Sequence, residues 1–147
     1  MKRINRSSYV TAVNFLMLGI FLAGCIVVVK EDDDRRRRYL QGSEWTLEVV
    51  FYRTQTVVSA DRTIQVDFAS DNTVTGLTAC GAFSGQYEVN ENGGITISSI
   101  ETPSSCQDSA EVELVTNSLR SATSYSATER ELTITTAEDG YLAFAAK

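Results

Sequence analysis

From Trp45 onward, short runs of alternating apolar and polar residues are separated by turn residues, and this pattern constrains the fold most strongly. In the clearest run, residues 63–69, Ile64, Val66 and Phe68 fall on one face of an extended chain. Turn signals follow several runs, as at Glu91-Asn92-Gly93-Gly94. The pattern predicts eight short strands, which indicates an antiparallel sandwich or barrel. The predicted strands are residues 45–52, 63–69, 73–79, 83–89, 95–100, 123–127, 131–136 and 140–145.

One segment after Pro103 has a helical period instead. Asp108 precedes Ser109-Ala110-Glu111 with the spacing of a capping box. Apolar residues then recur at helical spacing, at Val112, Val115, Leu119 and Ala122. We expect a helix of about three turns against the sheet or across a barrel end. It is the one helix predicted for the mature domain.

The N-terminus has the layout of a bacterial lipoprotein signal peptide. Basic residues at positions 2, 3 and 6 precede an apolar core that ends in Leu22-Ala23-Gly24-Cys25. We expect residues 1–24 to be removed and Cys25 to become a lipidated first residue that anchors the protein to a membrane. The alternative is an uncleaved anchor helix over residues 9–29. Because position 26 is Ile rather than Asp, the expected location in a Gram-negative cell is the outer membrane, facing the periplasm.

Residues 25–39 form the predicted lipidated N-terminus and tether. The stretch from Lys30 to Arg38 holds five basic and four acidic residues and has no apolar period. We expect it to be disordered or transiently helical and to act as a spacer. In the alternative interpretation, the arginines at positions 35–38 contact lipid phosphates.

The predicted folded domain, residues 40–147, is strongly acidic. It holds five basic and fifteen acidic residues, a net charge of −10. Such a domain repels nucleic acid, which we therefore exclude as a partner. The charge would suit a cationic ligand, although acidic surfaces more commonly serve solubility.

Cysteine and histidine counts restrict the chemistry further. With Cys25 assigned to lipid, Cys80 and Cys106 remain as an even pair in an oxidising compartment, which predicts a structural disulfide. The chain has no histidine, which excludes a Ser-His-Asp or Cys-His centre, and two thiolates do not complete a zinc site. The sequence also shows neither a paired-carboxylate motif nor a phosphate-binding loop. We predict no catalytic residues, no metal and no cofactor.

Three motifs resemble those of META (HslJ-like) domains. Residues 40–47 read Leu-Gln-Gly-Ser-Glu-Trp-Thr-Leu and resemble an opening Leu-x-Gly-x-x-Trp-x-Leu motif. Residues 76–87 resemble a central Gly-x-x-x-Cys-Asn-x-(aromatic)-x-Gly-x-Tyr motif, and residues 102–106 match Thr-x-x-x-Cys. The chain departs from the family at Gly81, where Asn is usual, which puts any binding role of that side chain in doubt.

The resemblance implies a β-rich, barrel-like domain with one helix, carried by small bacterial envelope lipoproteins associated with stress and antibiotic tolerance. It implies no agreed biochemical activity. Two hypotheses follow: a non-catalytic accessory protein that binds an envelope protein or peptide, or a carrier of a small apolar or cationic ligand. Aromatic residues at Trp45, Phe83 and Tyr87 are candidates for a ligand or partner surface, although such residues more often lie in the core. If the side chains at positions 64, 66, 68, 87 and 97 fill the barrel, partner binding is favoured.

Overall fold

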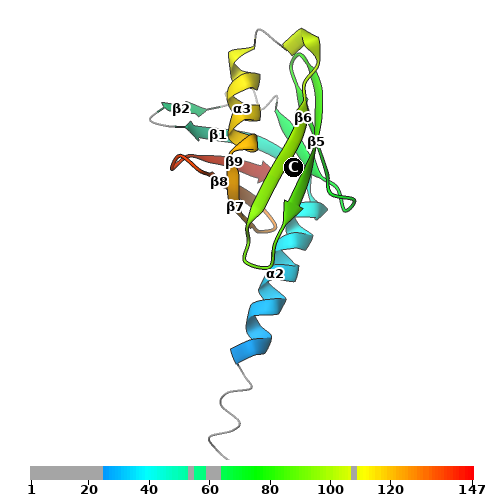
Figure 1. Ribbon diagram of the computed structural model, residues 1–147, viewed down its shortest axis with the longest axis vertical. Helices are drawn as coiled ribbons and strands as arrows, with labels where there is room; N and C mark the ends of the chain where they lie inside the picture. The colour runs from blue at the N-terminus through cyan, green and yellow to red at the C-terminus, as the bar shows by residue number, and fades with distance from the viewer. Residues whose placement is uncertain (1–24, 53–54, 59–63, 107–108) are drawn as a thin grey trace, which may run out of the picture. The chain divides into compact units, whose positions relative to one another are not determined.

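A computed structural model describes residues 25–52, 55–58, 64–106 and 109–147 (Figure 1). The predicted signal peptide, residues 1–24, lies outside the described residues. The chain divides into two compact units, Met1–Asp34 and Arg35–Lys147, and the fold belongs to the second. Its elements, with helix α2 beginning in the first unit, are α2 (Cys25–Gly42), β1 (Trp45–Tyr52), β2 (Gln55–Val58), β3 (Gln65–Phe68), β4 (Thr73–Thr78), β5 (Gly81–Val89), β6 (Ile95–Glu101), the 3₁₀ turn η1 (Ser104–Cys106), α3 (Ala110–Arg120), β7 (Ala122–Ala127), β8 (Glu131–Thr136) and β9 (Tyr141–Ala146).

The strands form one antiparallel sheet that curves into a nearly closed barrel. Eight strands follow the order β6-β5-β4-β3-β1-β9-β8-β7, and β2 pairs with β1 beside this path. The two end strands meet through a bridge between Gly94 and Ser124, where the Tyr125 backbone N–H donates to the Gly93 carbonyl at 2.9 Å. The predicted antiparallel barrel with a helix is therefore confirmed.

The barrel interior is filled by the apolar face of each strand. Burial alternates along β4, β5 and β8, as the period of two requires. The interior side chains singled out from the sequence are all 0–3 % exposed: Ile64, Val66, Phe68, Tyr87 and Ile97. They belong to one continuous hydrophobic core.

Each of the eight predicted runs contains a strand, and one further strand, β2, was not predicted. This four-residue strand forms a hairpin with β1, in which Val49 pairs with Val58 and Tyr52 with Gln55. A run this short carries too few alternations to stand out from a loop.

The helix α3 is confirmed, with two corrections at its ends. Its N-cap is Ser109, whose side-chain oxygen accepts from the Val112 backbone N–H at 3.4 Å, whereas Asp108 lies outside the described residues. The last predicted position, Ala122, belongs to β7 instead. Figure 1 shows α3 standing beside β6, with which it packs.

The expectation of a disordered or transiently helical tether is wrong, because residues 25–42 form helix α2. Each of the three aspartates at 32–34 precedes an arginine by four residues, a spacing that favours a helix. The C-terminal turns also pack on the barrel. Leu40 is fully buried, and its carbonyl accepts from the Trp45 indole N–H at 3.0 Å. This packing supplies the stability that the charged sequence lacks.

No helix among the described residues is both long and apolar enough to cross a membrane.

Candidate functional site

The three aromatic residues named as candidates for a ligand or partner surface are core residues. Trp45, Phe83 and Tyr87 are 0–2 % exposed. The Phe83 ring lies directly over Gly76, where a β-carbon would come within 2.1 Å of it. These residues therefore present no surface to a partner and occupy the core, as such residues more often do.

Tyr87 nevertheless makes polar contacts from within the core. Its hydroxyl donates to the Ala69 carbonyl at 2.7 Å and accepts from the Gln41 amide at 2.7 Å, so it joins helix α2 to the turn before β4. Its ring packs edge-on against Phe68 at 5.1 Å. Burial raises the pKa of the Tyr87 hydroxyl, and the Gln41 hydrogen bond offsets part of that shift.

The predicted disulfide between Cys80 and Cys106 is present, with the two α-carbons 5.4 Å apart. It ties the β4–β5 turn to the 3₁₀ turn η1. The Ser105 hydroxyl reinforces this link by donating to the Cys80 carbonyl at 2.8 Å. Cys25 begins helix α2, and its lipidation stays a prediction.

The departure at Gly81 has a structural reason. Gly81 has a φ of +145°, which disfavours residues with a side chain. A β-carbon there would also come within 2.8 Å of the Pro103 ring. An asparagine at position 81, which the resemblance leads us to expect, would therefore meet both backbone strain and the proline ring.

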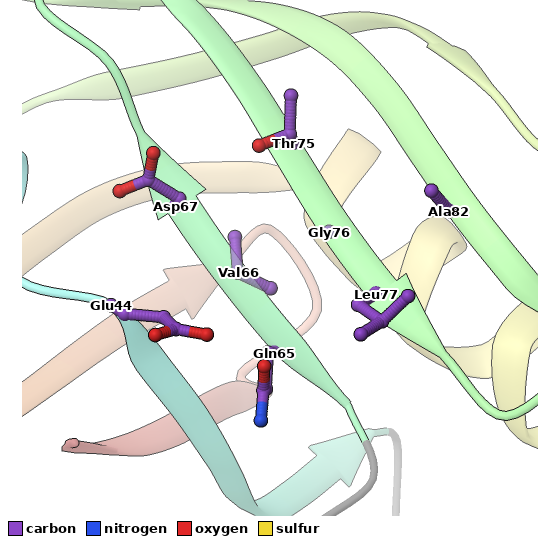
Figure 2. Close-up of a pocket in the computed structure, with 8 residues that line it drawn as sticks. All are labelled: Glu44, Gln65, Val66, Asp67, Thr75, Gly76, Leu77 and Ala82. Atoms are coloured by element: carbon purple, nitrogen blue, oxygen red, sulfur yellow. The ribbon is translucent and has the colours of Figure 1, made fainter.

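A groove on the outer face of β3 and β4 is the candidate site (Figure 2). It encloses about 250 Å³. Figure 2 shows Glu44 and Asp67 on the β3 side and Leu77 and Ala82 on the β4–β5 side. The lining residues are Glu44, Gln65, Val66, Asp67, Thr75, Gly76, Leu77 and Ala82.

Sheet register explains the shape of this groove. Gln65 pairs with Leu77, which pairs with Ala82, so their side chains form one outward row across three strands. In this row Leu77 is 52 % exposed. Leu77 was not among the predicted site residues. Its signal in the sequence is that an apolar residue stands at an outward position of β4.

The charge of the groove is negative. The Lys147 ammonium contacts the Glu44 carboxylate at 3.1 Å. No ion pair joins Asp67 to any residue in the described part of the chain. One carboxylate of the groove thus already holds an ammonium group, while the other is open to a further cation.

Described residues of the barrel unit also line two further hollows. One, of about 250 Å³, adjoins the groove through Gln65 and ends at Lys147. The other, of about 570 Å³, is lined by Arg35, Tyr39 and residues 128–131. Its lining includes two arginines, Arg35 and Arg130, and two glutamates, Glu129 and Glu131, so its charges balance and select neither sign of ligand. Across the described residues, no group of three or more metal-binding side chains could hold an ion.

Solved structures with this fold come from several proteins. A DUF4847 family protein from Bacteroides vulgatus is 14 % identical, with a TM-score of 0.63 over 76 % of this chain and 96 % of its own. A protein from Burkholderia xenovorans is 17 % identical, with a TM-score of 0.59 over 74 % of this chain and 83 % of its own. At such identities the likeness shows the fold alone. No curated protein matches the sequence.

A model of the META domain matches residues 38–147, which include all nine strands and helix α3. The three motifs noted in the sequence lie within this match. The chain therefore belongs to the META domain family.

Proposed function

We propose that this protein is a non-catalytic envelope lipoprotein whose META domain binds another envelope protein or a peptide through its outer surface. The filled barrel interior carries the proposal. The five side chains that decide between the two hypotheses, at positions 64, 66, 68, 87 and 97, are all buried in the core. A carrier of a small ligand needs that space for its cargo. Binding on the outside of the barrel needs no rearrangement of the core.

The cellular setting is part of the same proposal. The Leu22-Ala23-Gly24-Cys25 sequence supports a lipid anchor, and Ile26 supports the outer membrane in a Gram-negative cell. An anchored domain meets its partners at a raised local concentration, so modest affinity suffices. The family resemblance supports an accessory role in stress or antibiotic tolerance.

Crosslinking in intact envelopes tests the proposal. The full chain and its Cys25→Ser variant are compared in parallel, and crosslinked partners are isolated and identified by mass spectrometry. We expect a discrete partner with the wild type and less of it with Cys25→Ser, because loss of the anchor lowers the local concentration. If no protein crosslinks reproducibly to the wild type, the proposal is wrong.

Intact mass provides the companion measurement. The expected mature protein begins at Cys25, carries the mass of the lipid and lacks the two hydrogen atoms that the Cys80–Cys106 bond removes. A mass equal to that of the whole unprocessed chain would contradict the lipoprotein assignment and leave an uncleaved anchor.

A further inference from the structure

We infer that the groove over β3 and β4 docks an extended segment of the partner that carries Lys or Arg two residues away from an apolar side chain. This inference rests on the proposed function and specifies the chemistry of what is bound.

The apolar half of the site is Leu77. It is the most exposed of the large hydrophobic side chains among the described residues. A single exposed Leu is ordinary on a protein surface. Here, however, it borders a hollow whose floor is formed by the chain at Val66 and Gly76. An apolar side chain placed beside Leu77 would remove both from water.

The polar half of the site is Asp67. Because Leu77 pairs with Gln65, Asp67 is the diagonal neighbour of Leu77, and such neighbours lie about 7–8 Å apart. Alternate residues of an extended peptide, whose side chains share a face, lie about 7 Å apart. An extended segment therefore presents a cation at Asp67 and an apolar group at Leu77 from alternate positions.

Charge determines which partner fits. The folded domain has a net charge of −10, so its field attracts basic segments. The Lys147 ammonium already contacts both carboxylate oxygens of Glu44, at 3.1 and 3.2 Å. A lysine or arginine of a partner would make the corresponding contact with Asp67. The hollow near Arg35, with its balanced charges, offers no such selection.

Peptide binding to the full chain in detergent micelles tests the inference. The probe is a fluorescent peptide that repeats Val-Ser-Lys-Ser, so that valine and lysine lie two residues apart on one face of the extended chain, and binding is measured by anisotropy. Two further peptides replace lysine by glutamate or valine by glycine. We expect the valine–lysine peptide to bind at least fivefold more tightly than either of the others. The glutamate peptide lacks the cation for Asp67, and the glycine peptide lacks the apolar side chain for Leu77.

Variants then locate the binding. Asp67→Asn and Leu77→Ser should each weaken binding at least fivefold. The matched controls are Glu88→Gln, which removes an exposed carboxylate from another strand, and Tyr141→Ser, which removes an exposed apolar side chain from β9. We expect both to bind as the wild type does. Equal weakening by a control and its matched groove variant, or no binding of the valine–lysine peptide, would overturn the inference.

The same variants separate this inference from the proposed function. If the crosslinked envelope partner is retained by Asp67→Asn and Leu77→Ser, the protein binds a partner elsewhere and the groove assignment is wrong. If the wild type captures no partner, the proposed function fails. Loss of the partner with the groove variants, but not with Glu88→Gln, supports both.

Discussion

At the residue scale, Gly81 shows how one position fits its neighbour. Where the sequence resemblance leads us to expect Asn, Gly81 adopts a φ of +145° against the Pro103 ring. The glycine and the proline thus fit each other. The departure is visible in the sequence, but its cause is a contact between two residues that lie 22 positions apart.

We expect Gly81→Asn to lower the free energy of unfolding by about 1–3 kcal/mol, because the side chain adds backbone strain and a clash with Pro103. Urea unfolding measures the change. In the background of Pro103→Ala the cost should shrink, since the clash is relieved while the strain remains. An unchanged urea midpoint for Gly81→Asn alone would show that position 81 tolerates a side chain.

Tyr87 provides a second test at this scale. Tyr87→Phe should cost about 1–2 kcal/mol at neutral pH, because the Ala69 carbonyl and the Gln41 amide lose their shared partner. Burial raises the pKa of this hydroxyl above its ordinary value of 10.0. The unfolded chain therefore ionises first, and wild-type stability falls as pH rises above about 10. Urea unfolding between pH 9 and 11 should show a smaller fall for Tyr87→Phe. An equal fall would mean that Tyr87 does not contribute to it.

At the element scale, eight of the nine strands were predictable and the helix ends were not. Period-two alternation places a strand's apolar face from the sequence alone, so β4, β5 and β8 were found. Helix α2 was missed because its charged sequence has no apolar period, and its stability depends on Leu40 being buried by the barrel. The candidate groove was missed for a related reason. Asp67 and Leu77 become neighbours only through the pairing of β3 with β4.

Leu40→Ala tests the role of that helix end. We expect it to lower the free energy of unfolding by about 2–4 kcal/mol, since a fully buried side chain is removed from the core. The matched control is Arg38→Ala. Arg38 is an exposed residue of the same helix, and arginine has a helix propensity similar to that of leucine. Urea unfolding should show little change for the control. Similar losses for both variants would contradict the proposed role of Leu40 burial in stability.

At the scale of the whole molecule, the disulfide connects two parts of the fold that the pairing of strands does not connect. It joins the β4–β5 turn to η1, and η1 precedes helix α3. The sequence argument for this pairing used the anchor assignment, because an unlipidated Cys25 would leave a third thiol in an oxidising compartment. The cysteine count together with the N-terminal motif predicted the pairing, since assigning Cys25 to lipid left two cysteines.

Replacing both cysteines tests this connection. The bond closes a loop of 26 residues, so Cys80→Ala with Cys106→Ala should lower the free energy of unfolding by about 3 kcal/mol. Reductant should shift the urea midpoint of the wild type to that of the double variant and leave the double variant unchanged. The unreduced wild type, unfolded in urea, should titrate no free thiol if Cys25 carries its lipid. One titratable thiol, with the reductant effect intact, would separate a correct disulfide from an incorrect anchor.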